Sequence, residues 1–191
     1  MLRVKEGDTA AFTVLIEKYK QPVMNLAWRI LGDPTEAEDL AQNVFVQVWK
    51  SAGRYQATAK FSTWLFTIAR NLCWNEIRRR TRHPADSLDQ ARTSDGEQLA
   101  MQIEDKRQSG VSDQLLRHEL ERKVEEAVAA LPANQRTALA LCQQDELSYE
   151  EIAAVLGCSL SATKSLIFRA RETLKARLKP YLQTGAWEKM K

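Results

Sequence analysis

The residues best suited to chemistry lie in one segment, Phe61–Arg82, whose character changes along its length. The first half is aromatic and apolar, whereas the second half carries a cluster of arginines together with Asn71 and Asn75, four residues apart. Bases stack on aromatic rings, amides bind base edges, and guanidinium groups bind phosphate. We therefore interpret Phe61, the amides and the arginines as a site for one strand of nucleic acid. The alternative is that the aromatic residues are core and the arginines a solvated helix end.

A second segment, Leu147–Leu178, has the residue pattern of a helix-turn-helix. Ser148, followed three residues later by Glu151, forms a capping box that begins a short apolar helix. Gly157 supplies the turn, because glycine adopts left-handed backbone angles at little cost. A longer helix follows, apolar on one face and basic on the other. This layout predicts a recognition helix for a DNA major groove, with an ordinary helical hairpin as the alternative.

The rest of the composition argues against several other classes of protein. No nucleophile–base pair, phosphate-binding glycine loop or cluster of metal ligands is visible, so we expect no enzyme, no cofactor and no metal site. The cysteines and histidines are isolated from one another, which favours buried or incidental thiols over a disulfide framework or a zinc site. The net charge is only +3, so any argument about partners rests on where the charge lies. The absence of a long apolar run indicates a cytoplasmic chain that does not insert into a membrane.

The elements that must position these residues all read as helices, so we predict an all-α fold. Glycine and proline are few, and strand-like alternation is not found. A capping signal at Asp8 begins a helical pattern that continues to Leu31, and Pro22 predicts a break or kink that divides it into two helices. Asp33, Pro34 and Glu36 form a second helix-start signal, with an N-cap acceptor, a proline at the first helical position and a glutamate at the third. This signal predicts a helix that stops at Gly53.

That third helix is apolar on more than one face. Leu40, Val44 and Val48 share the face expected to pack on a core, while Phe45 and Trp49 lie around the side. Such a helix is either sandwiched inside its own domain or docked on a partner, and its periodicity is compatible with both.

A change in composition divides the chain into two small helical domains, residues 1–83 and 113–182. Residues 84–112 between them are polar and acidic, a composition that predicts a flexible linker. We expect Pro180 to end the last helix, and the tail at 183–191 gives no firm signal.

Four stretches resemble the extracytoplasmic-function (ECF) sigma factors, the two-domain bacterial initiation factors. Regions 2.1 and 2.2 of the family are similar to GDTAAFTVLIEKY and PTEAEDLAQNVFVQVWKSAGRY. Regions 2.3 and 2.4 are similar to FSTWLFTIARNLCWNEIRRR, and region 4 to LPANQRTALALCQQDELSYEEIAAVLGCSLSATKSLIFRARETLK. The four stretches stand in the family's order across a polar linker, and this makes the resemblance specific.

The resemblance implies a subunit of bacterial core RNA polymerase that docks on the β′ clamp and β flap, binds promoter DNA and is restrained by an anti-sigma factor. In the family, the region 2.2 helix binds the β′ clamp. The matching positions are Asp39, Gln42, Phe45 and Trp49. Regions 2.3 and 2.4 melt the −10 element and capture a flipped base. The matching positions are Lys60, Phe61, Asn71, Asn75 and Arg78. The recognition helix reads the −35 element. The matching positions are Lys164, Ser165, Phe168, Arg169 and Arg171.

The chain also departs from the family pattern. Asn43 stands where the family usually has glutamate, and Leu166 where arginine is frequent. Thr163 falls at a position that is normally buried between the two helices, so its hydroxyl needs a partner such as a carbonyl one turn back. A relative's promoter sequence is therefore not transferable to this chain.

Two other functions fit parts of the pattern. A conventional helix-turn-helix regulator would use residues 1–83 for sensing or dimerisation and would bind duplex DNA without polymerase. A protein-interaction module with the same fold would act as an antagonist. A nucleic-acid enzyme is the weakest alternative, for want of catalytic groups.

Overall fold

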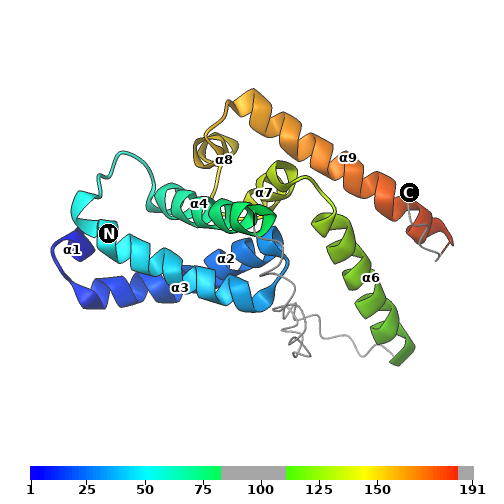
Figure 1. The fold of residues 1–191 in the computed structure, drawn as a ribbon, viewed down its shortest axis with the longest axis horizontal. Coiled ribbons are helices and arrows are strands. Elements are labelled where there is room, and N and C mark those ends of the chain that lie inside the picture. The colour runs from blue at the N-terminus through cyan, green and yellow to red at the C-terminus, as the bar shows by residue number, and fades with distance from the viewer. Residues whose placement is uncertain (83–110, 185–191) are drawn as a thin grey trace.

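The computed structural model of the chain describes residues 1–82 and 111–184, and every regular element in these ranges is a helix (Figure 1). In chain order these are α1 (Leu2–Lys5), α2 (Thr9–Leu31), α3 (Pro34–Ser51), the 3-10 turn η1 (Ala52–Arg54), α4 (Phe61–Arg82), α6 (Val111–Ala129), α7 (Ala133–Cys142), α8 (Tyr149–Leu156) and α9 (Leu160–Thr184). The prediction of an all-α fold is confirmed. Most of the predicted linker and the end of the tail lie outside the described residues.

Helices α2, α3 and α4 pack together in the N-terminal half. The Asp8 carboxylate accepts a hydrogen bond from the backbone N–H of Ala11 (2.9 Å), and Asp33 accepts one from the N–H of Glu36 (2.9 Å). These caps begin α2 and α3 where the sequence predicts. Between them, Gly32 ends α2 with a φ of 77°, in the left-handed region that favours glycine.

The interior of this bundle is filled by large apolar side chains. The largest that are fully buried are Val23, Leu26, Ile30, Val44, Val48, Leu65 and Phe66. Full burial of one such side chain stabilises the folded state by roughly 1.5–3 kcal/mol, so this core fixes which faces of α3 and α4 point outward.

Pro22 does not break α2, and the prediction of two helices there is wrong. A proline inside a helix removes one backbone hydrogen bond and crowds the preceding turn, at a cost of about 3 kcal/mol. Tyr19 and Val23, on either side of the proline, are 7% and 0% exposed. Packing of this helix face into the bundle therefore outweighs the local penalty.

The bounds of the C-terminal half also differ from those predicted. Helix α6 begins at Val111, so residues 111 and 112 belong to it and not to the linker. Helix α9 continues through Pro180 to Thr184, so the prediction that this proline ends the helix is wrong. Tyr181 is half-buried and interacts with Glu119 of α6, and this contact holds the last turn in place.

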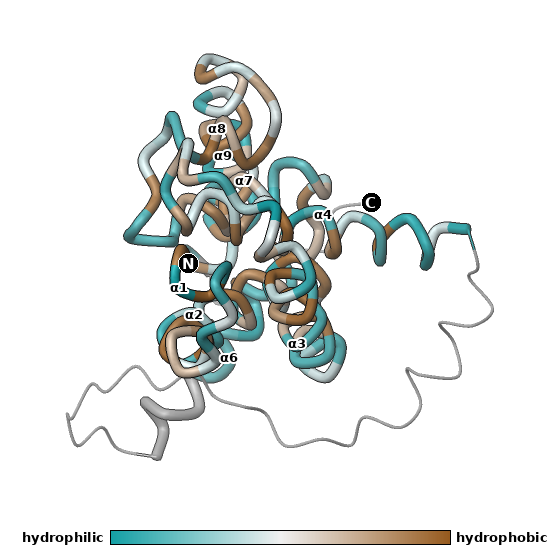
Figure 2. The backbone as a smooth tube through the Cα atoms, turned by 90° about the vertical axis from the view of Figure 1, so that its left-hand side faces the viewer, coloured by the Kyte–Doolittle hydropathy of each residue, from teal (hydrophilic) through white to brown (hydrophobic). Residues whose placement is uncertain are grey.

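The two halves share one apolar core. Leu141 of α7 and Ile152 and Val155 of α8 are buried in the same cluster as residues of α2, α3 and α4. Figure 2 shows the C-terminal end of α4 projecting from the helical body, and this end is coloured mostly as hydrophilic. Helix α4 therefore has one part inside the shared core and one end at the surface.

Candidate nucleic-acid and protein interfaces

The helix-turn-helix forms with the local geometry that the sequence predicts. The Ser148 hydroxyl accepts from the N–H of Glu151 (3.2 Å), and the Glu151 carboxylate accepts from the N–H of Ser148 (2.8 Å), which completes the capping box. Gly157 ends α8 with a φ of 67°. The N–H of Cys158 then bonds to the carbonyl of Ala153 (3.1 Å), so the turn closes back on α8.

The inner face of α9 is buried. Thr163, Ile167 and Ala170, spaced by four and three residues, are at most 2% exposed. The Thr163 hydroxyl donates to the carbonyl of Ser159 (3.1 Å), one turn back, and lies 3.2 Å from the Cys158 sulfur. The predicted partner of this hydroxyl is therefore present, and a buried threonine is accommodated without an unpaired polar atom.

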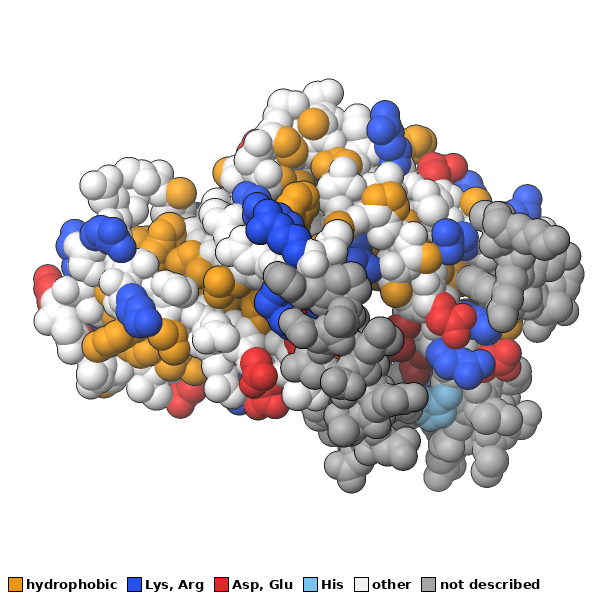
Figure 3. Space-filling view, in the orientation of Figure 1, with side chains coloured by type: hydrophobic (Ala, Val, Ile, Leu, Met, Phe, Trp, Pro, Cys, Tyr) orange, Lys and Arg blue, Asp and Glu red, His pale blue; other side chains and the backbone are white. Residues whose placement is uncertain are grey.

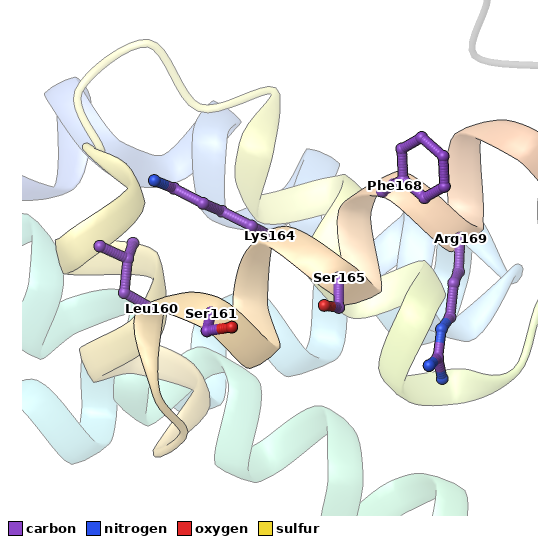
Figure 4. Close-up of a pocket in the computed structure, with 6 residues that line it drawn as sticks. All are labelled: Leu160, Ser161, Lys164, Ser165, Phe168 and Arg169. Atoms are coloured by element: carbon purple, nitrogen blue, oxygen red, sulfur yellow. The ribbon is translucent and has the colours of Figure 1, made fainter.

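The outer face of α9 forms an open groove of about 680 Å³ at the start of the helix (Figure 4). Its lining residues are Leu160, Ser161, Lys164, Ser165, Phe168 and Arg169. Phe168 is 65% exposed, so its ring is available for contact on this face of the helix. Cationic, hydroxyl and aromatic groups on one exposed helix face are the groups that contact phosphates and base edges.

Four of the five residues predicted for the recognition helix line this groove. The fifth, Arg171, lies on another side, where its guanidinium donates to the sulfur of Cys142 (3.5 Å). Sequence reasoning missed Leu160 and Ser161. Ser161 precedes Ser165 by four residues, so helical spacing could have identified it.

The amides of α4 lie on its surface near the arginines. Asn71 and Asn75 are exposed, as is Arg78. The Arg78 guanidinium donates to the side-chain oxygen of Asn75 (3.3 Å) and to the carbonyl of Trp74 (3.3 Å). The structure therefore brings Asn75 and Arg78 together, with Asn71 one helical turn earlier on the same face.

Lys60 and Phe61 lie at the other end of α4, about 15 Å along the helix axis from Asn71. The Lys60 ammonium forms an ion pair with Glu151 (3.1 Å). Phe61 is half-buried, with its ring edge-on to the ring of Tyr19 at a centroid distance of 5.3 Å. These two predicted residues therefore form a group separate from the amides.

Not all of the arginines are available to a ligand. Arg80 donates to the carbonyl of Leu31 (3.1 Å) and pairs with Glu36, which joins α4 to the α2–α3 corner. Burial lowers the pKa of Arg80. Arg70 donates to a carbonyl of α8. The interpretation of the whole cluster as phosphate-binding is therefore wrong for these two, which are structural. Arginines that remain exposed cover the C-terminal end of α4 (Figure 3).

The predicted polymerase-binding residues of α3 divide between surface and core. Asp39 and Gln42 are exposed, and Trp49 is 40% exposed. Phe45 is 6% exposed and contacts the ring of Phe12, so in this structure it is not part of the surface. The residue that the sequence reasoning missed is Val46, which is 46% exposed. Steps of three, four and three residues place Asp39, Gln42, Val46 and Trp49 on one face, and this spacing was the available signal.

Other reactive groups offer no second site in the described ranges. Burial raises the pKa of the Cys73 thiol to about 12. No group of three or more His, Cys, Asp or Glu in residues 1–82 and 111–184 could hold a metal ion. Over the same ranges, no single helix is long and apolar enough to cross a membrane. Helices α8 and α9 together, bent by 96°, meet that criterion by length and composition only.

Both halves match known protein families. Residues 15–83 match the family described as Sigma-70 region 2, and residues 121–174 match Sigma-70, region 4. The chain is 36% identical over 184 residues to the RNA polymerase sigma-H factor of Pseudomonas aeruginosa, which covers 95% of this chain and 93% of that protein. It is 34% identical over 180 residues to the ECF RNA polymerase sigma factor SigW of Bacillus subtilis, with 93% and 94% covered.

Two solved structures have a similar fold. The sigma factor RpoE of Bartonella quintana, in complex with the anti-sigma factor NepR, has a TM-score of 0.67 at 26% identity, with 88% of this chain and 97% of that chain covered. CnrH in complex with the cytosolic domain of CnrY has a TM-score of 0.67 at 24% identity, with 93% and 94% covered.

The exposed basic face of the helix-turn-helix defines this chain as a DNA-binding protein. A second helical half, which carries surface amides and arginines, accompanies that motif and matches Sigma-70 region 2. With relatives of this identity along nearly its whole length, the chain belongs to the ECF RNA polymerase sigma factors.

Proposed function

We propose that this chain binds bacterial core RNA polymerase and directs transcription from promoters that it selects. The observation that carries the proposal is the groove on α9, where Lys164, Ser165, Phe168 and Arg169 face away from the buried row at Thr163. A helix with such a face fits the major groove, which is about 12 Å wide. The two cations bind phosphate or guanine edges, and the ring contacts thymine methyl groups, so this half reads the −35 duplex.

The N-terminal half captures the melted non-template strand of the −10 element. The residues assigned to this role are Lys60, Phe61, Asn71, Asn75 and Arg78. Taking a base out of the stack costs a few kcal/mol, and stacking on an aromatic ring returns about 1–3 kcal/mol per base. The hydrogen bond between Arg78 and Asn75 holds a guanidinium and an amide next to each other in the chain without DNA. Both groups are therefore already positioned for binding the strand. Binding energy alone opens the DNA, so the function requires neither a catalytic group nor a cofactor.

The face of α3 docks the chain on the polymerase in the cytoplasm. Asp39, Gln42 and Trp49 contact the β′ clamp, and Val46 completes their exposed face. Phe45 supports this face from beneath through its contact with Phe12. The C-terminal half binds the β flap, which places the recognition helix upstream of the melted strand.

An anti-sigma factor restrains the chain. Support for this comes from one similar solved structure, at 26% identity, in which the sigma factor RpoE is bound to the anti-sigma factor NepR.

Transcription with purified core polymerase on sheared genomic DNA of the source bacterium tests the proposal. Adding the chain should yield transcripts that core alone does not make, and the pair of substitutions Lys164→Ala and Arg169→Ala should reduce them. Duplex binding without new transcripts would instead identify a conventional regulator. Core binding that only suppresses transcription by another sigma factor would identify an antagonist.

A further inference from the structure

The first helix of the chain lies against the turn that leads towards α4. Helix α1 contacts α2 and the 3-10 turn η1, and Figure 1 shows it at the end of the molecule where the chain passes from α3 to α4. The Val4 side chain of α1 is 2% exposed. Burial of this apolar group favours the contact, so the short helix is a packed part of the N-terminal half.

An ion pair also joins α1 to the start of α2. The Arg3 guanidinium pairs with the Asp8 carboxylate (2.6 Å), and the same carboxylate caps α2 through the N–H of Ala11. The N–H of Asp8 in turn donates to the carbonyl of Arg3 (3.1 Å). Arg3 thus fixes α1 on α2, and the contact of α1 with η1 is made by the other cation of this helix, Lys5.

The Lys5 side chain reaches the turn that follows α3. Its ammonium donates a hydrogen bond to the main-chain carbonyl of Tyr55 (3.1 Å), at the end of η1. The N–H of Tyr55 donates to the carbonyl of Ala52 (3.0 Å), and the residue is buried. A hydrogen bond made by an ionised group is roughly twice as strong as one between neutral groups. Tyr55 is therefore held by both of its main-chain polar groups as well as by its ring.

The ring of Tyr55 belongs to an aromatic cluster that includes Phe61. It lies edge-on to the ring of Trp64 at a centroid distance of 5.0 Å and to the ring of Phe61 at 6.4 Å. Phe61 and Trp64 also contact each other, at 6.0 Å. Aromatic pairs favour defined relative orientations, so the position of Tyr55 influences the orientation of Phe61, the ring assigned to strand capture.

Tyr55 is also the residue from which an exposed loop begins. This segment, Gln56–Lys60, which we call the capture loop, joins η1 to α4, and all of its residues are exposed. Among the residues that the structure describes, none forms a hydrogen bond with residues 56–59. The Lys60 carbonyl accepts from the N–H of Trp64 (3.3 Å). The position of the loop is therefore set by its two ends, Tyr55 before it and the first turn of α4 after it.

The Lys5 hydrogen bond thus acts on the proposed strand site by two routes. One route runs along the capture loop to Lys60, and the other runs through the aromatic rings to Phe61. A loop that is already fixed before the strand binds loses less conformational entropy on binding than a loop that must be ordered. A fixed loop also presents one pocket shape, which is the basis for preferring one base over another.

We propose that Lys5 is a positioning residue for strand capture. Its hydrogen bond to the Tyr55 carbonyl holds the capture loop and the Phe61 ring in the geometry that selects the captured base. Lys5 itself does not contact the base in this role. The proposal rests on the proposed function, because the melted strand is the ligand assigned to this site.

Three variants of the full chain separate positioning from charge. Lys5→Met keeps the unbranched stem and removes the ammonium, whereas Lys5→Arg keeps a cationic donor near the carbonyl. Lys20→Met is the matched control, since it removes the same charge from an exposed lysine of α2. Thermal melts of all three variants establish that they remain folded at the assay temperature.

The assay measures base preference directly. Core polymerase loaded with each variant is mixed with single-stranded DNA that has a randomised central segment, and the bound fraction is sequenced. The wild type should enrich a short motif with one most restricted position, the captured base. Loss of one hydrogen bond corresponds to roughly a three- to tenfold change in an equilibrium, so Lys5→Met should reduce the preference at that position by about this factor. Lys5→Arg and Lys20→Met should keep the preference within about twofold of wild type.

The sequence pattern distinguishes the possible roles of Lys5. Loss of a charge weakens binding about equally for all sequences, so it leaves the motif unchanged. A Lys5→Met motif identical to that of wild type, or an equal loss of preference in Lys20→Met, would overturn the positioning role. A wild-type complex that enriches no motif would instead overturn the proposed strand capture, so the two failures are distinguishable.

Discussion

Truncation of Trp49 should weaken the complex with core polymerase by an amount that follows from its exposure. The side chain is 40% exposed on the outer face of α3. A tryptophan presents up to about 250 Å² of surface, so about 100 Å² remains for a partner to cover. At about 25 cal/mol per Å², Trp49→Ala should cost about 2.5 kcal/mol of binding, or roughly 70-fold in the dissociation constant.

The assay is a titration of labelled chain with purified core polymerase, since no promoter DNA is needed. The ring of Trp49 also packs on Phe12 at a centroid distance of 4.9 Å, so thermal melts must show that the variant remains folded at the assay temperature. Leu182→Ala is the matched control, because this leucine is 67% exposed at the far end of α9. Wild-type affinity in the Trp49 variant, or an equal loss in the Leu182 control, would refute the docking face.

Three further predictions concern other parts of the chain. Lys164→Ala should make the salt dependence of −35 duplex binding shallower, because one phosphate contact is lost. The magnitude of the slope of log affinity against log salt should fall by about one unit, measured with polymerase holoenzyme across a salt series. Gly157→Ala should destabilise the chain by about 1 kcal/mol and lower its Tm by about 2–4 °C in calorimetry, because the residue has a φ of 67°. Burial of Cys73 disfavours its thiolate and raises the pKa of the thiol from 9.0 to about 12, so the folded state favours the neutral thiol. Its contribution to stability is therefore complete below pH 9.0 and is lost as the pH rises through about 12. Chemical denaturation over that window should show a smaller decline in Cys73→Ala, and an identical decline would contradict the burial argument.

The parts of the fold that sequence predicts well are those decided by neighbouring residues. The caps at Asp8 and Asp33 and the capping box at Ser148 depend on contacts within one helical turn. The partner of the Thr163 hydroxyl is equally local, one turn back at Ser159. Such features are decided by residue type and spacing alone.

The errors arise where distant packing decides. Pro22 looks like a helix break, yet the burial of Tyr19 and Val23 on either side keeps α2 continuous. Arg80 looks like a ligand for phosphate, but the fold places it on the carbonyl of Leu31. The contact of Arg70 with α8 joins residues far apart in the chain, and no periodicity within one helix could reveal it.

The face of α3 illustrates a third kind of difference. In a helix with 3.6 residues per turn, neighbouring side chains lie about 100° apart around the axis. Phe45 and Val46 are both apolar, so apolar character alone could not tell which of them is buried and which is exposed. The structure buries the first and exposes the second. Val46 therefore takes a place on the proposed docking face beside Trp49, and Phe45 supports the face from within.

Mapping the 5′ ends of transcripts that core polymerase makes on genomic DNA, with and without this chain, decides whether the chain selects promoters. We predict a set of new start sites that share two sequence blocks upstream, at a fixed spacing, as expected for a chain that reads one duplex element and one melted element. Start sites that are unchanged by the chain, or new ones without a shared pair of blocks, would contradict it.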